Sequence, residues 1–269
     1  MRRSGFSRWL SALALSRPPG TILQHMYIEE RLRNRAPGTF IEIGVGRGFL
    51  TKLLLDLGWR GVGLELNPDA IEAASALNAD ARQDRRLEIH CMDWFSYDCS
   101  AKTNLIISSM VLEHLDDQLE KLYFEKCRAL LEDGGLGVLL VPASPPHWGV
   151  EDDIVGHHRR YTPDQLRSKL TASGFTVSHL VGLTYPLSNV LLPLSNRLVS
   201  RHSRFVGTLS RREQTKRSSM IEIQWKTKFP RVASLLVNAI TLYPFHILQK
   251  MNKNNKSSLV LYVEFGRNS

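Results

Sequence analysis

The sequence of 269 residues predicts one doubly wound α/β domain built on a mainly parallel sheet of seven strands. Short apolar runs alternate with helix-type patterns from residue 22 to residue 185, and this alternation is typical of βαβ units. Proline, glycine and capping residues mark the helix boundaries between the runs. The apolar share of 43% and the charged share of 23% are those of a folded protein with a sizeable core.

Each predicted strand is an apolar, β-branched run that is followed by a turn signal. The strands are predicted at Thr39–Ile43, Gly61–Glu65, Leu87–Cys91, Asn104–Ser108, Gly137–Val141, Thr176–Val181 and Ser258–Phe265. Helices are predicted at Ile22–Asn34, Phe49–Leu57, Pro68–Leu77 and Asp116–Leu131, and after Thr162 as far as Ser173. Asn67 is the expected N-cap of the third helix, and Thr162 with Gln165 forms a capping box. Asp133-Gly134-Gly135 is the expected stop of the fourth helix.

The chain is expected to divide into four segments. Residues 1–21 form a basic N-terminal segment, 22–185 the core and 257–269 the final edge strand of the core. Residues 186–256 form a basic apolar helical insertion, expected either to cover the substrate or to contact a membrane surface. The net charge is +5 over residues 1–35, −7 over residues 36–185 and +11 over residues 186–269. Basic ends around an acidic core indicate either an anionic partner for the flanks or a solvated basic surface.

Two apolar stretches in the flanks predict either contact with a membrane surface or packing against the domain better than they predict a membrane span. The first twenty residues contain a short apolar run that Arg8 interrupts, so a basic amphipathic helix fits better than a signal peptide. The uncharged run 232–248 contains Asn238, Pro244 and His246, and this composition favours an interfacial helix or an active-site cover. A cytoplasmic protein, peripheral at the inner face of the membrane, is the corresponding expectation.

Cysteine and histidine spacing predicts no metal site. Cys91, Cys99 and Cys127 form no CxxC pair, and the nine histidines show no ligand spacing. Reduced thiols in a cytosolic protein are expected.

The segment from Phe40 to Gly48 reads FIEIGVGRG and predicts a ligand site at the end of the first strand. Closely spaced glycines let a ligand approach the backbone at the start of a helix. Phe49 stands where a nicotinamide-dinucleotide fingerprint needs its third small residue, so the glycine spacing disfavours a dehydrogenase. Glu42 on a buried strand needs a partner, which is either the ligand or a polar group of the protein itself.

Two more acids are predicted at the same edge of the sheet. Glu65 ends the second strand, where a carboxylate can accept hydrogen bonds from ribose hydroxyls. Asp93 follows the third strand, where it is either an adenine acceptor or a plain turn residue, and Trp94 offers a flat apolar wall.

Taken together, these motifs resemble the class I S-adenosylmethionine (SAM)-dependent methyltransferases of the small-molecule branch, over residues 22–185. The segment from Ser108 to Leu115 contains the VLEHL motif that follows the fourth strand in that branch. The resemblance implies SAM as the cofactor and a Rossmann-like methyltransferase fold. It implies cofactor contacts from Glu42, Gly44, Val45, Gly46, Gly48, Glu65, Leu66, Asp93, Trp94 and Ser109. Asn104, where the family often has aspartate, and the insertion 186–256 depart from the family pattern.

The stretch from Pro142 to Thr162 resembles the GHxRRY box of methyltransferases in the small-molecule and glycan-modifying branch. It follows the fifth strand, where α/β sheets place ligand loops. The predicted substrate contacts are His147, Trp148, His158, Arg160 and Tyr161. The alternative is a loop held by its own salt bridges, from Asp152 or Asp153 to Arg159 or Arg160.

The expected reaction is methylation of a small-molecule, saccharide or lipid-linked acceptor, at oxygen. A hydroxyl acceptor needs a base, for which His114 and His157 are the candidates, although a lone histidine can equally be structural and a carbon or amine acceptor need not use one. The pI near 9.6 makes nucleic-acid methylation an alternative, but no (D/N)PP(Y/F/W) motif follows the fourth strand and aromatic–basic interleaving is thin. A SAM-binding adaptor without activity, attached to a membrane surface, is the second alternative.

Overall fold

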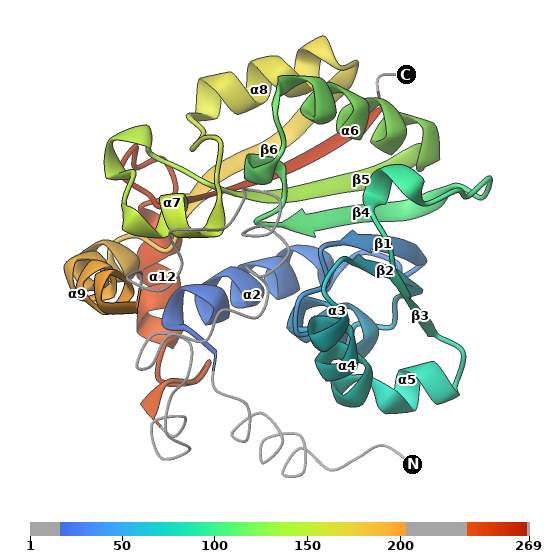
Figure 1. Cartoon of the computed structure of the whole chain (residues 1–269), viewed down its shortest axis with the longest axis horizontal. Coiled ribbons are helices and arrows are strands. Elements are labelled where there is room, and N and C mark those ends of the chain that lie inside the picture. The colour runs from blue at the N-terminus through green and yellow to red at the C-terminus, as the bar shows by residue number, and fades with distance from the viewer. Residues whose placement is uncertain (1–16, 203–235, 268–269) are drawn as a thin grey trace.

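The computed structural model describes residues 17–202 and 236–267, which fold around a single seven-stranded sheet (Figure 1). The strand order is β3-β2-β1-β4-β5-β7-β6. The first five strands are parallel, and β7 pairs antiparallel with both β5 and β6. The strands are β1 (Thr39–Ile43), β2 (Arg60–Glu65), β3 (Leu87–Cys91), β4 (Thr103–Ser109), β5 (Leu131–Pro142), β6 (Phe175–Leu183) and β7 (Val260–Arg267). The predicted doubly wound, mainly parallel sheet is therefore confirmed.

Helices cover both faces of the sheet (Figure 1). The α-helices are α2 (Pro19–Leu32), α3 (Phe49–Asp56), α4 (Pro68–Leu77), α5 (Ala79–Gln83), α6 (Asp117–Leu130), α7 (Val150–Val155), α8 (Pro163–Ala172), α9 (Leu187–His202) and α12 (Tyr243–Met251). Three 3₁₀ turns are η1 (Trp94–Ser96), η2 (Leu112–His114) and η3 (Pro145–His147). One core cluster packs α6 and α8 against the sheet, and a second packs α2 and α3 against the other face.

Helix starts follow the capping residues in the sequence. The Asn67 side chain accepts a hydrogen bond from the Asp69 backbone at the start of α4, and Thr162 and Gln165 form a reciprocal capping box at the start of α8. These caps fix the helices that follow β2 and precede β6. The short helix α5 was not predicted.

Two expectations for the end of the sheet are wrong. The segment 257–269 was expected to supply an edge strand, but β7 lies between β5 and β6, and the edges of the sheet are β3 and β6. Its buried residues on both faces agree with an interior position. Asp133-Gly134-Gly135 was expected to end a helix, but it lies inside β5 at a register irregularity, because Leu131 already pairs with Thr103 of β4.

The insertion contributes two described helices beside the carboxyl ends of the parallel strands. Helix α9 contains Pro193, and it packs against α7 through Val199 and Ile154. The segment before α12 packs against α2 through Leu242. The predicted N-terminal amphipathic helix and Pro230 lie outside the described residues, as does the start of the run 232–248. Among the described helices, none has the length and apolar character that crossing a bilayer requires.

Candidate active site

A cavity of about 1270 Å³ opens at the carboxyl ends of the parallel strands. The ends of β1, β2 and β4 form its floor, and residues from α2, α7 and α9 form its walls. A doubly wound sheet places its ligands at this edge. The predicted site residues that line the cavity are Gly44, Gly46, Glu65, Leu66, Asp93, Trp94, Ser109, His114, His157, His158 and Arg160.

The glycine turn after β1 leaves room for a ligand at one position in particular. Gly46 has a φ of +53°, and a Cβ atom built on it would meet no other atom within 4 Å. Gly44 also has a positive φ, of +79°, but a Cβ atom there would lie 2.5 Å from Val111. Gly44 is therefore required by packing, whereas Gly46 faces open space at the cavity.

Glu65 is held in place by the backbone of the turns around it. Its carboxylate accepts hydrogen bonds from the backbone N–H groups of Gly46 at 2.8 Å, Leu66 at 2.9 Å and Asn67 at 3.0 Å. The residue is 8% exposed and lines the cavity. Glu65 therefore links the glycine turn to the end of β2. A carboxylate at this place can accept hydrogen bonds from ribose hydroxyls.

Asp93 and Trp94 form the next part of the wall, after β3. Asp93 caps η1 by accepting a hydrogen bond from the Phe95 backbone at 2.8 Å, as expected of a turn residue. It also lines the cavity. Trp94 is 4% exposed, and the ammonium of Lys126 lies 5.1 Å from the centre of its ring.

Three predicted cofactor residues do not line the cavity. Glu42 is buried and accepts a hydrogen bond from the Thr51 hydroxyl at 2.5 Å. Thr51 is therefore the polar group of the protein that was expected as one of the two possible partners of Glu42. Burial raises the pKa of Glu42 to about 8. Val45 packs in the core, and Gly48 packs against α4, so both support the turn from behind.

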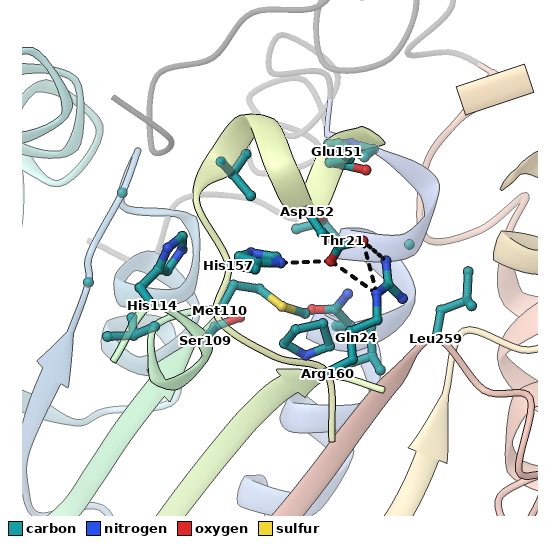
Figure 2. A pocket seen from close by; sticks show the side chains of 18 of the residues that line it. Thr21, Gln24, Ser109, Met110, His114, Glu151, Asp152, His157, Arg160 and Leu259 are labelled. Atoms are coloured by element: carbon teal, nitrogen blue, oxygen red, sulfur yellow. Dashed lines mark hydrogen bonds and ion pairs between the residues drawn. The ribbon is translucent and has the colours of Figure 1, made fainter. Parts of the chain in front are cut away.

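His157 belongs to a polar cluster that is centred on the carboxylate of Asp152 and includes Arg160 (Figure 2). Its Nδ1 atom lies 2.8 Å from Asp152 Oδ1. Arg160 donates to the same carboxylate from Nε at 3.0 Å and from Nη2 at 2.9 Å, and to the Ala143 carbonyl at 3.1 Å. Burial raises the pKa of Asp152, but the hydrogen bonds from His157 and Arg160 outweigh it and leave this pKa below its ordinary value. The cluster thus fixes the orientation of the His157 ring, and it includes the Asp152–Arg160 salt bridge foreseen as an alternative.

Glu113 and His114 approach His157 from η2. Glu113 is fully buried, and its Oε1 lies 3.6 Å from His157 Nε2. Burial raises the pKa of Glu113 to about 7 and lowers the pKa of His114 to about 3. The rings of His114 and His157 meet edge to face, with centroids 4.8 Å apart. The two predicted catalytic histidines are therefore neighbours on the cavity wall.

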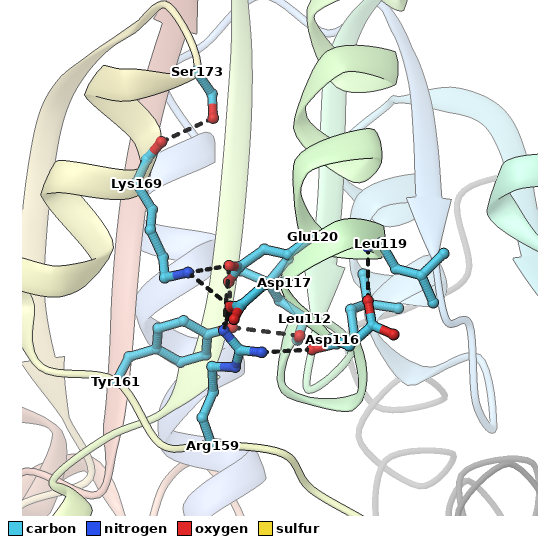
Figure 3. A network of polar contacts seen from close by, with 10 residues as sticks. Leu112, Asp116, Asp117, Leu119, Glu120, Arg159, Tyr161, Lys169 and Ser173 are labelled. Atoms are coloured by element: carbon cyan, nitrogen blue, oxygen red, sulfur yellow. Dashed lines mark hydrogen bonds and ion pairs between the residues drawn. The ribbon is translucent and has the colours of Figure 1, made fainter.

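The remaining predicted substrate residues lie outside the cavity lining. Tyr161 is buried, and its hydroxyl donates to Glu120 at 2.7 Å in a network with Arg159 and Lys169 (Figure 3). His147 contacts the Ser144 hydroxyl at 2.8 Å, and the Trp148 indole contacts Asp153 at 3.0 Å. These contacts hold the loop after β5 together.

Sequence reasoning missed several residues of the site. It identified Asp152 only as a salt-bridge partner, and Glu113 only as part of the VLEHL motif. Gln24 on α2 and the leucines of α9 also line the cavity. A polar residue on the buried side of a predicted helix was the available signal for Gln24, whereas a cover over the site was one of the two roles expected of the insertion that contains α9.

The cavity residues fit SAM as the cofactor. The open space at Gly46 would receive the amino-acid part, the fixed acid Glu65 the ribose, and Asp93 with Trp94 the adenine. When bound, SAM supplies a methyl group that is already activated for displacement.

Comparisons with known proteins identify the family of the chain. Residues 21–180 match the family model described as a methyltransferase domain. The glycopeptide N-methyltransferase MtfA in complex with SAM is 22% identical, with a TM-score of 0.51 over 61% of this chain and 87% of that one. MtfA in complex with sinefungin is 17% identical, with a TM-score of 0.54 over 94% of this chain and 88% of that one. No curated protein matches the chain.

The structures support the fold, and the family model spans more than half of the sequence. The chain belongs to the methyltransferase-domain family and is a SAM-dependent class I methyltransferase.

Proposed function

We propose that this methyltransferase methylates a hydroxyl group of a small-molecule, saccharide or lipid-linked acceptor that has an apolar part. The observation that carries the proposal is the extension of the cavity beyond the cofactor residues, to a wall that joins His114 and His157 with the apolar side of α9.

The cavity is large enough for two ligands. Pockets for one drug-sized ligand measure about 300–1,000 Å³, and this cavity measures about 1270 Å³. Its α9 wall contains Leu191, Leu192 and Leu198, which supply apolar contact area. An acceptor with an apolar part would bury that part against α9 and present its hydroxyl to the histidines.

The protein groups at this end suit the activation of a hydroxyl. Asp152 holds His157 through Nδ1, which leaves Nε2 on the side of Glu113. His114 is neutral at pH 7 because burial lowers its pKa to about 3. Orientation of the acceptor behind the methyl group supplies much of what methyl displacement needs. MtfA is named an N-methyltransferase, so an amine acceptor is the alternative. Identification of the methylated product distinguishes an amine acceptor from a hydroxyl acceptor.

A lipid-linked acceptor is supported by the outer surface of the insertion. Val190 of α9 and Tyr243 and Met251 of α12 are exposed outside the cavity lining, and residues 186–269 carry a net charge of +11. Exposed apolar groups among basic residues favour an anionic lipid surface. The proposed location is the inner face of the membrane.

The test is methyl transfer from isotope-labelled SAM to a panel of amphipathic phenols, saccharides, glycolipids and amines, with product identification by mass spectrometry. We expect label in a methyl ether, and a loss of turnover of about 10²-fold or more in His157→Gln with SAM affinity within about two-fold of wild type. His90→Gln, which removes an exposed histidine outside the cavity, is the matched control. Label only in amines contradicts the oxygen assignment. SAM binding without transfer to any acceptor would favour the adaptor alternative.

A further inference from the structure

Glu113 is a buried carboxylate that the hydrogen bonds of the protein do not satisfy. Its exposed fraction is 0%, and neither carboxylate oxygen has a hydrogen-bond partner among the described residues. Buried polar groups in folded proteins are nearly always paired, and an isolated buried charge is costly. A cation bound at this carboxylate would remove the cost.

The two histidines that approach Glu113 complete a set of ligand atoms. One ligand atom from each of Glu113, His114 and His157 lies within 4.8 Å of the other two. With zinc–nitrogen and zinc–oxygen bonds of about 2.0–2.2 Å, ligand atoms of a tetrahedral site lie roughly 3.3 Å apart. His157 Nε2 and Glu113 Oε1, at 3.6 Å, are close to that spacing already.

Groups behind the histidines orient them as metal ligands are usually oriented. A histidine that binds a metal through one nitrogen donates its other N–H to a carboxylate or a backbone carbonyl. The Asp152 carboxylate forms this contact with Nδ1 of His157, and the Gly156 backbone forms a hydrogen bond with His114. Arg160 pairs with Asp152, so Glu113 is the carboxylate of this group that is left for an ion.

We propose that Glu113, His114 and His157 bind one divalent transition-metal ion, with Zn²⁺ the expected ion. Two histidines and one glutamate are a ligand set of catalytic zinc sites, which keep a fourth position open. Both histidines line the cavity, so the open position faces the acceptor end. The expectation of no metal site rested on the spacing of ligand residues along the chain. That spacing does not reveal this cluster, because His157 is far in sequence from Glu113 and His114.

Such an ion would act on the acceptor. A bound divalent metal lowers the pKa of a water or hydroxyl that coordinates it. This role rests on the proposed function, because it requires a hydroxyl acceptor. Binding of the ion requires no acceptor and is tested separately.

The test uses the full-length, tag-free protein after treatment with a chelator. Zn²⁺ alone is titrated by calorimetry, and Co²⁺ alone is followed by its visible absorption, which reports the coordination geometry. We expect one ion per chain and cobalt bands of a four- or five-coordinate site. Glu113→Gln and His114→Gln should each weaken binding by at least about 10-fold. His90→Gln removes a histidine that lies 3.4 Å from Glu88 outside the cavity, and it should leave binding unchanged.

SAM affinity measured on the same samples shows whether each variant is folded. Wild-type protein that binds SAM but takes up no zinc or cobalt would overturn the proposal, and methyl transfer that persists in chelator would then leave the proposed function standing. Equal zinc affinity in wild type, Glu113→Gln and His114→Gln would also overturn it. If Glu113→Gln fails to bind SAM, His114→Gln alone decides.

Discussion

Two glutamates on neighbouring strands have different roles because they occupy different places along those strands. Glu65 is the last residue of β2, so its carboxylate reaches the turn amides and the cavity. Glu42 lies one residue before the end of β1, and its carboxylate is enclosed with the Thr51 hydroxyl. Enclosure in an apolar surrounding disfavours the charged form, which is why the pKa of Glu42 rises to about 8.

The raised pKa of Glu42 predicts a loss of stability with rising pH. The folded state keeps a proton that the unfolded state loses, so the free energy of unfolding falls as the pH rises from about 4.5 to about 8. We expect Glu42→Gln to be more stable than wild type at pH 8 by about 4 kcal/mol, with a much smaller difference at about pH 5. Urea unfolding at both pH values checks this. The exposed Glu125→Gln is the control, and an unchanged pH slope in Glu42→Gln would contradict the assignment.

At residue scale, the sequence predicted the cofactor side of the site better than the acceptor side. Glu65 ends a strand that the sequence identifies, and Gly46 and Asp93 follow two others, so their place at one sheet edge could be inferred. The role of Glu42 could not be decided, because its partner Thr51 is fixed only by the packing of α3. Asp152, His157 and Glu113 meet through tertiary contacts, which no local pattern reports.

At the scale of elements, the side chain of Asn104 joins three strands. Its Oδ1 accepts a hydrogen bond from the Thr39 backbone at 2.9 Å, and its Nδ2 donates to Glu132 at the start of β5. An amide can accept and donate at once, whereas an ionised aspartate can only accept. Asn104, where the family often has aspartate, therefore suits a neighbour that is itself an acid, Glu132.

The substitution Asn104→Asp should destabilise the fold. It replaces a hydrogen bond between Asn104 and Glu132 with the contact of two carboxylates, at an expected cost of about 1–2 kcal/mol. Thermal and urea unfolding measure the change. Adding Glu132→Gln places an amide donor opposite the introduced carboxylate and should recover most of the loss. An Asn104→Asp variant as stable as wild type would contradict this account.

Element boundaries followed the sequence where local signals control them. β1 and β3 have the predicted limits, and α4 and α8 start at their predicted caps. The start of β5 was missed because its pairing with β4 extends the strand past Gly134 and Gly135, although glycines usually mark a stop. The interior position of β7 depends on strand order, which its own sequence does not specify.

At the scale of the whole molecule, the insertion both walls the cavity and presents an outer surface. Leu191 and Leu192 of α9 line the cavity, whereas Val190 is 73% exposed and is not among the lining residues. Helix α12 adds Met251, 76% exposed. The same segment can therefore contact an acceptor inside and a lipid surface outside, and the sequence left these two roles as alternatives.

The outer surface predicts binding to anionic membranes. The full-length protein should sediment with vesicles of phosphatidylglycerol and phosphatidylcholine at low salt, and much less at high salt, because screening weakens the attraction of the basic segment. Vesicles of phosphatidylcholine alone are the control. Replacing Val190 and Met251 by serine should weaken binding. Absence of binding to anionic vesicles at low salt would remove the membrane from the account.

The central claim is that this cavity binds SAM through the fixed acid at the end of β2. Calorimetric titration of the wild-type chain and of Glu65→Ala with SAM, S-adenosylhomocysteine and NAD tests it most directly. We expect micromolar binding of both adenosyl ligands, weakened about 10-fold or more in Glu65→Ala, and no comparable binding of NAD. Undetectable adenosyl binding, tighter binding of NAD or equal affinities in the two proteins would contradict the claim.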